Sequence, residues 1–306
     1  MANASGISFV ICTYNRAQYL QDTLQSLVEN KADPNRFELL IVDNNSTDQT
    51  PAVVRQFIDD YPNYNIRYVK ESQQGLSFAR NRGISEAKSP IITFLDDDIS
   101  TDIDFINNWL QFFDNHPNAQ CAGGRIEVQF DDPRPDWMSH FLLPLLGHHD
   151  LGDNITTYKR QHYPFGGNMA FKQSIFEEHG FFDTELGRKG NQLKASEEKE
   201  FFRRLKKTNT DIYYVPKATL YHRVDKQRLT KEYIKRQSIG LGQSIALQLQ
   251  DKAMADKLLK GSSEVFKMIV TLGLFLPYSL TFQPSKAVML IKFRKWIIEG
   301  YLSVSK

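Results

Sequence analysis

The first hundred residues alternate between short apolar runs and longer amphipathic segments. Apolar runs at 7–12, 37–42, 66–69 and 91–95 have the length of buried strands. Between them, residues 19–29, 50–61 and 77–87 carry apolar side chains at helical spacing. Strands that alternate with helices indicate an α/β fold, in which helices cover both faces of a mostly parallel sheet.

Polar residues follow three of these predicted strands, at 13–16, 43–48 and 96–98. Open α/β sheets bind ligands at the carboxyl ends of their strands. The fourth predicted strand ends on Asp96, Asp97 and Asp98, whose ionised carboxylates repel one another unless a cation is bound. Oxygen ligands suit Mg²⁺ or Mn²⁺, which often bind substrate phosphates as well. The pattern predicts a metal–diphosphate site, with a solvated acidic loop as the alternative.

The pattern changes after residue 100. Helical spacing recurs at 105–113, 199–207 and from 230 to about 259, and short strands are predicted at 126–130 and 212–215. Residues 131–151 contain Pro, His and Gly, and we expect a long functional loop there.

The C-terminal part is strongly apolar. Its longest stretch without a charge, 268–283, is shorter than the roughly 20 residues that span a bilayer. Residues 287–302 contain Trp296, and four basic residues lie within or directly before this segment. This pattern favours a helix that lies in a membrane interface. A helical lid over the rest of the chain is the alternative.

Composition and missing motifs exclude several classes of protein. The 38 basic and 36 acidic residues give a net charge of +2, which argues against a nucleic-acid binder. No GxGxxG follows the first strand and no GxxxxGK[ST] occurs, which argues against dehydrogenases and P-loop enzymes. Cys12 and Cys121 suit a reducing compartment. The first residues lack a basic region followed by an apolar one, so a cytoplasmic location is expected.

Four segments in order, 11–16, 42–48, 75–83 and 94–98, resemble the inverting family-2 glycosyltransferases. Matches continue at 166–171, 180–183 and 196–198, and become sparse beyond about residue 245. The resemblance implies a GT-A (Rossmann-like) fold, a nucleotide-sugar donor, a divalent metal (Mn²⁺ or Mg²⁺) and inversion at the anomeric carbon. It also implies a catalytic domain at 1–245, with a nucleotide-sugar-binding half at 1–130 and an acceptor half at 131–245. Residues 246–306 are then a helical C-terminal extension.

The family pattern assigns the metal and nucleotide sites to particular residues. Asp98 corresponds to the main metal ligand, with Asp96 and His222 as further ligands. The expected nucleotide contacts are Thr13, Tyr14, Asn15, Arg16, Asp43, Asn44, Arg80, Asn81, Asp96 and Asp97. A purely structural Arg80 is the alternative. UDP is the expected nucleotide, with dTDP or GDP left open because Asn44 stands where many relatives carry Asp.

The same resemblance assigns the catalytic residues. Glu198 corresponds to the general base, with Glu197 beside it at the start of a helix. Gly166 and Gly167 would bring backbone close to the donor sugar, and Asn168 would bind its hydroxyls. Trp137 is an expected platform for the acceptor, and a core position is its alternative.

Together these features predict a metal-dependent inverting glycosyltransferase that moves one sugar to a saccharide or glycolipid acceptor. Its expected role is the synthesis of surface polysaccharide or glycolipid. A sugar nucleotidyltransferase and a non-catalytic nucleotide-sugar-binding protein of the same fold are the alternatives. Peripheral contact of the C-terminal region with the inner face of the membrane is left open.

Overall fold

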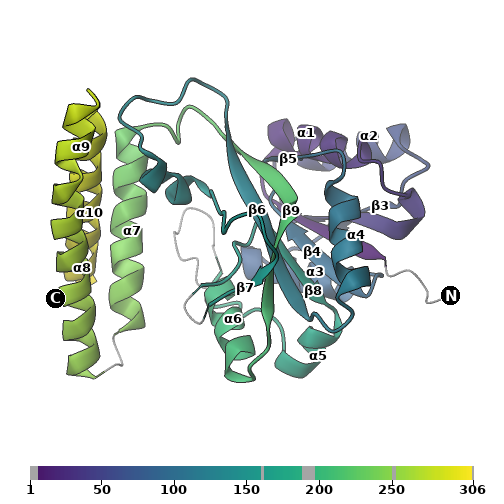
Figure 1. Ribbon diagram of the computed structural model, residues 1–306. Helices are drawn as coiled ribbons and strands as arrows, with labels where there is room; N and C mark the ends of the chain where they lie inside the picture. Colours follow the sequence, from purple (N-terminus) through teal and green to yellow (C-terminus); the bar gives the residue numbers. More distant parts are fainter. Residues whose placement is uncertain (1–5, 160–161, 188–196, 250–252, 305–306) are drawn as a thin grey trace. The chain divides into compact units, whose positions relative to one another are not determined.

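The computed structural model describes residues 6–159, 162–187, 197–249 and 253–304 (Figure 1). The first half of the chain forms β1 (Ile7–Thr13), α1 (Ala17–Val28), η1 (Pro34–Arg36), β2 (Phe37–Asp43), α2 (Thr50–Asp60), β3 (Ile66–Lys70), α3 (Leu76–Glu86), β4 (Ile91–Leu95), β5 (Ile99–Thr101), α4 (Phe105–Asn115), β6 (Cys121–Phe130) and η2 (His140–Leu146). The second half forms β7 (Thr156–Thr157), β8 (Asn168–Lys172), α5 (Ser174–His179), α6 (Glu197–Lys207), β9 (Ile212–Val224), α7 (Lys231–Gln248), α8 (Met254–Gly273), α9 (Phe275–Leu280) and α10 (Pro284–Val304).

The strands form a single mixed sheet in the order β3-β2-β1-β4-β8-β6-β9-β5, with β7 paired to β9. Strands β3, β2, β1 and β4 are parallel, and β8 pairs antiparallel with β4. The α/β class predicted from the sequence is therefore confirmed. Its parallel part is the region where strands and helices alternate most regularly.

Both faces of β1, β2 and β4 are buried. In β1, Phe9 and Ile11 point into the apolar cluster that includes α1, α2 and α4, whereas Val10 points into the cluster that includes α3 and α6. Because each face of such a strand meets a helix, its sequence is mostly apolar rather than alternating, with Ser8, Glu38 and Thr93 as buried polar exceptions. Most polar residues in this region therefore lie just after the strands, at the carboxyl edge of the sheet.

The chain divides into two compact units that interleave along the sequence. We call Met1–Glu127 with His149–His222 the sheet unit, and Val128–His148 with Arg223–Lys306 the helical unit. The domain ranges expected from the sequence, 1–245 and 246–306, are by contrast continuous.

The helical unit has its own core, in which η2 packs with α7 and α10. Figure 1 shows α7, α8 and α10 side by side. Gly242 and Gly300 lie where α7 and α10 approach most closely: a Cβ on Gly242 would lie 2.1 Å from the Ile297 carbonyl oxygen, and one on Gly300 would lie 2.1 Å from that of Ile239. The two backbones can approach this closely because neither glycine has a side chain.

Several elements differ from the sequence-based expectation, and three of the differences concern the site and the C-terminal helices. The helix predicted from 230 to about 259 is two helices, since α7 ends at Gln248 and α8 begins at Met254. The strand predicted at 212–215 continues through Pro216 to Val224. Strand β8, at Asn168–Lys172, was not predicted.

Candidate active site

Three acidic side chains and one arginine gather at the carboxyl end of β4. The Thr13 hydroxyl donates to Asp97 Oδ2 at 2.7 Å, and Arg16 pairs with Asp97 at 3.4 Å and also with Asp98. Burial, together with the adjoining Asp98 carboxylate, raises the pKa of Asp97 to about 7 and also raises the pKa of Asp96. Arg16 therefore offsets the repulsion among these carboxylates only in part.

Asp96, Asp98 and His222 together form a set of metal-ligating side chains. Strand β9 pairs antiparallel with β5, so that His222 lies opposite Ile99, the residue after Asp98. His222 Nε2 is 3.3 Å from Asp98 Oδ1, and one ligand atom from each of the three residues lies within 4.8 Å of the others. Carboxylate oxygens suit Mg²⁺ or Mn²⁺, and imidazole is a common metal ligand. The donor set and the repulsion between its carboxylates fit a divalent cation.

The two loops expected to bind the nucleotide are tied together by their own side chains. Asn15, with a left-handed backbone at φ 53°, accepts a hydrogen bond from the Thr47 amide at 2.8 Å and donates its own amide to the Ser46 hydroxyl at 2.9 Å. Asp43 accepts from the Ser46 amide at 2.8 Å and from the Tyr68 hydroxyl at 2.6 Å. Ser46, Thr47 and Tyr68 were not predicted as site residues, because nothing in their spacing marks them as partners of these loops.

Asn44 belongs to the second of these loops, and its side chain is buried. Its Nδ2 donates to the Gln73 carbonyl at 2.7 Å, and its Oδ1 accepts from the Gly75 amide at 2.7 Å. These bonds fix the loop that leads into α3. Tyr14, by contrast, is 41% exposed, so its ring remains open to a ligand.

Arg80 connects α3 to the start of α6. It is 3% exposed, and its Nη1 and Nη2 donate to Glu197 at 2.9 Å and Glu198 at 2.7 Å. Burial alone lowers the pKa of Arg80, but the Glu198 and Glu197 carboxylates raise it overall, so the guanidinium stays charged. The Asn81 side chain forms two hydrogen bonds with the Phe182 backbone, at 2.9 and 3.0 Å. The Arg80 and Asn81 side chains, both expected to contact the nucleotide, thus have partners within the protein.

A two-glycine turn lies between Glu198 and Asp96. The Gly166 amide donates to Glu198 Oε2 at 3.2 Å. A Cβ on Gly166 would lie 1.7 Å from Glu198 Oε1, and one on Gly167 would lie 2.3 Å from Asp96 Oδ2. A side chain at either position would displace the Glu198 or Asp96 carboxylate, which glycine leaves in place. The predicted base and the predicted metal ligands therefore flank the same turn.

The two remaining predicted residues have different surroundings. Asn168 is fully buried, and its Nδ2 donates to the carbonyls of Arg125 at 2.9 Å and Ala218 at 2.8 Å. In this structure it ties β8 to β6 and β9. Trp137 belongs to the helical unit, where it packs against the core, with Lys231 Nζ 6.0 Å from its ring centroid. All the other predicted site residues belong to the sheet unit.

Residues 8–180 match the family model described as Glycosyl transferase family 2. The chain belongs to glycosyl transferase family 2. The family expected from the sequence is thus confirmed, and this family-2 protein is a glycosyltransferase.

Among curated proteins, this family-2 chain is similar to the glucosyl-dolichyl phosphate glucuronosyltransferase of Haloferax volcanii. The two are 24% identical over 245 residues, which cover 78% of this chain and 75% of the relative. Among solved structures, it is similar to a mannosyltransferase of Pyrobaculum calidifontis in complex with GDP-Man and Mn²⁺. That match has a TM-score of 0.66 at 16% identity and covers 99% of this chain and 88% of the other.

A second solved structure is S. aureus TarS 1-349 in complex with UDP-GlcNAc. It has a TM-score of 0.52 at 18% identity and covers 98% of this family-2 chain and 83% of the other. The structural neighbours confirm the GT-A fold.

Proposed function

We propose that this glycosyltransferase is metal-dependent and inverting, and that it transfers one sugar from a nucleotide-diphosphate sugar to an acceptor hydroxyl. The supporting observation is the turn Gly166-Gly167, which has the Asp96 carboxylate on one side and Glu198 on the other. A donor sugar above this turn would have its diphosphate on the side of the acidic cluster. Its anomeric carbon would then be open to an acceptor beside Glu198.

The protein's residues have distinct roles in this proposal. Asp98, Asp96 and His222 would hold a divalent cation, which would supply positive charge to a departing diphosphate. Tyr14 offers its ring to the nucleobase. Asn15, Asp43 and Asn44 shape the loops around the base through the contacts described above.

Glu198 accepts the proton of the acceptor hydroxyl. Its carboxylate is 26% exposed, and Arg80 and the Gly166 amide hold it in place. Attack from this side, opposite the diphosphate, inverts the anomeric configuration. Glu197 is 1% exposed and shares Arg80, so it supports Glu198 rather than receiving the proton itself.

The proposal for the acceptor and the cellular role is supported by the names of the relatives. The Haloferax volcanii relative carries glucosyl-dolichyl phosphate in its name, and another relative is a succinoglycan biosynthesis protein. We propose a saccharide or glycolipid acceptor in surface-glycan synthesis, at the cytoplasmic face of a membrane. The solved neighbours bind GDP-Man or UDP-GlcNAc, which leaves the nucleobase to be measured.

A thermal-shift panel tests the donor site. UDP, dTDP, GDP and CDP are each added with and without Mn²⁺, and one of them is expected to raise the melting temperature only when the metal is present. Asp98→Asn should abolish the metal-dependent part, while Asp104→Asn, the same change at an exposed position, should preserve it. An identical shift with and without metal, or in Asp98→Asn, contradicts the metal site.

The anomeric configuration of the product tests inversion. The responsive nucleotide is supplied as its α-linked sugar, and the product is examined by NMR coupling constants. A β-linked product is expected. An α-linked product would assign a retaining mechanism and a different role to Glu198.

A further inference from the structure

Helix α8 packs against α10 through its polar side. Glu264 and Thr271, seven residues apart and hence on one face of the helix, are each 5% exposed. Arg294 of α10 lies 4.0 Å from Glu264 Oε2 and donates to the Thr271 hydroxyl at 3.4 Å. Lys267 pairs with Glu264 at 2.6 Å. A helix at the surface of a water-soluble protein has the opposite arrangement, with its polar side outward.

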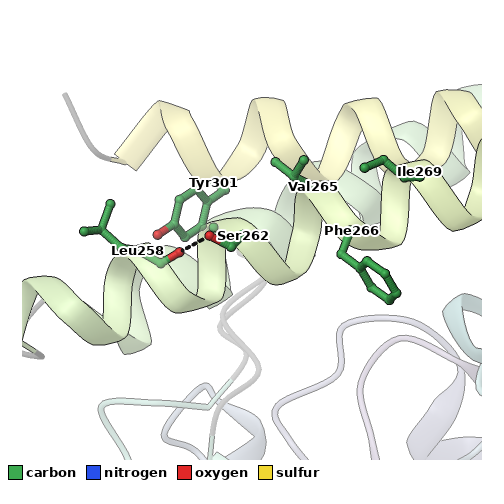
Figure 2. Close-up of a pocket in the computed structure, with 7 residues that line it drawn as sticks. Leu258, Ser262, Val265, Phe266, Ile269 and Tyr301 are labelled. Carbon is green, nitrogen blue, oxygen red and sulfur yellow. Dashed lines mark hydrogen bonds between the residues drawn. The ribbon is translucent and has the colours of Figure 1, made fainter.

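The other side of α8, continued into α9, is apolar and exposed. We call it the α8 face; its residues are each 51–66% exposed and comprise Leu258, Val265, Phe266, Ile269, Leu272 and Leu276. Figure 2 shows Leu258, Val265 and Ile269 along α8, with Tyr301 of α10 beside Leu258; these residues line a groove of about 500 Å³. Single exposed apolar residues are common, but a continuous stripe of this kind indicates an interaction surface.

Length and charge favour a lipid bilayer as the occupant of this face. Leu258–Leu280 has the length and composition of a membrane-crossing helix, and only 11% of its apolar window is buried. Polar residues turned inward and apolar residues turned outward are the arrangement of helices in contact with lipid. Residues 253–304 contain seven Lys or Arg and three Asp or Glu, which complements anionic headgroups.

Helix α10 indicates a one-sided contact rather than a crossing. Its exposed side carries Lys292, Lys295 and Glu299, which need water. Its opposite sides pack against α7 and α8. The helical unit thus has one water-facing and one apolar surface, as interfacial helices do.

We propose that the α8 face docks into the headgroup region of an anionic lipid bilayer. The inference rests on the proposed function in one respect: docking would bring the enzyme to a lipid-borne acceptor, whose hydroxyl lies at the bilayer surface. Insertion covers the exposed leucine, valine, isoleucine and phenylalanine side chains, while the net positive charge of residues 253–304 attracts the anionic headgroups.

Vesicle flotation of the full chain tests this proposal. The vesicles contain phosphatidylcholine with or without phosphatidylglycerol, and binding is expected to be tighter with phosphatidylglycerol. The double variant Val265→Glu/Ile269→Glu should lower partitioning at least about tenfold, because each substitution puts a carboxylate where an apolar side chain inserts. Val288→Glu is the matched control: Val288 is 42% exposed on the water-facing side of α10, and binding should be unchanged.

Three results would overturn the proposal: no flotation of the wild type, equal flotation of the double variant, or a dimer in solution that the double variant dissociates. The last result would assign the α8 face to a second copy of the chain. The nucleotide thermal shift of the double variant is measured in parallel. A retained shift shows that the variant is folded, and absence of a shift in the wild type would count against the donor site alone.

Discussion

The Glu198 carboxylate has two partners within the protein, Arg80 and the amide of Gly166. A charge-assisted hydrogen bond to a buried guanidinium fixes both the position and the orientation of a carboxylate. Arg80 is itself held by Glu197, so the three residues form one rigid group at the start of α6. Such rigidity suits a base that must meet an acceptor hydroxyl within hydrogen-bonding distance.

At this scale we predict that Glu198→Gln lowers kcat by roughly 10²–10⁴ while donor binding is retained. The amide preserves the size of the side chain and accepts from Arg80, but it cannot take up a proton. The measurements are turnover with the responsive donor and the thermal shift given by its nucleotide.

Glu200→Gln is the matched control for that variant. Glu200 lies on the same helix and pairs with Arg204 at 2.9 Å, four residues further on. A half-exposed pair at this spacing on a helix contributes only about 0.3–0.5 kcal/mol to stability, and Glu200 is not placed at the site, so turnover should be nearly unchanged. Wild-type turnover in Glu198→Gln, or an equal loss in both variants, would place the base elsewhere.

The sequence predicted which residues gather at the site better than it predicted what they touch. The motifs identified Arg80, Asn44 and Asp43, yet each has hydrogen-bond partners inside the protein. Arg80 and Glu198 are 118 positions apart, and no local pattern reveals such a pair. The acidic run Asp96–Asp98 was easier to interpret, because adjacent carboxylates repel one another unless a cation is bound, wherever the rest of the chain lies.

Among the elements, the contact between α7 and α10 is unusually close because of Gly242 and Gly300. We predict that Gly300→Ala lowers the free energy of unfolding by about 1–3 kcal/mol, since the new methyl group meets the Ile239 carbonyl in a packed interface. Urea denaturation of the full chain measures the change.

Gly261→Ala provides the comparison. It lies within α8, and no heavy atom lies within 4 Å of the position of an added Cβ. Alanine favours helix by up to about 1 kcal/mol relative to glycine, so this variant should be as stable as the wild type or more stable. Equal stability of Gly300→Ala and the wild type would mean that the two helices separate at low cost.

Elements with regular periodicity were predicted well, and those with irregular sequences were not. Strands β1 to β4 and helices α1 to α3 lie within one or two residues of their expected bounds. The strand at 212–215 was expected to end before Pro216, because proline usually ends a strand. In the structure, β9 continues through Pro216 and brings His222 to the acidic cluster. The missed β8 is only five residues long and follows two glycines.

For the whole molecule, the sequence indicated either membrane contact through residues 287–302 or a helical lid, whereas the exposed apolar surface is on α8 and α9. Within α10, Leu290, Phe293 and Ile297 are buried in the core of the helical unit. Apolar periodicity shows that a helix has an apolar side, but it cannot show which of several such helices pack together.

Interleaving of the two units gives a prediction about truncation. A chain that ends at residue 222 keeps η2 but loses α7 and α10. Met138, Leu142 and Leu146, now at most 2% exposed, would then face water, at about 1.5–3 kcal/mol each. We expect such a chain to aggregate or to bind a hydrophobic dye, relative to the full chain. A soluble truncation that melts cooperatively would show instead that the sheet unit is independent of residues 223–306.

The same interleaving affects the order in which the protein can fold as it is made. Residues 128–148 leave the ribosome before residues 149–222, and their partners in α7 and α10 come later still. At a synthesis rate of about 5–20 residues per second, their apolar side chains wait on the order of 4–15 s before the first of those partners is made. During that interval the sheet unit can form, and the segment from Val128 to His148 remains a binding site for a chaperone on the nascent chain.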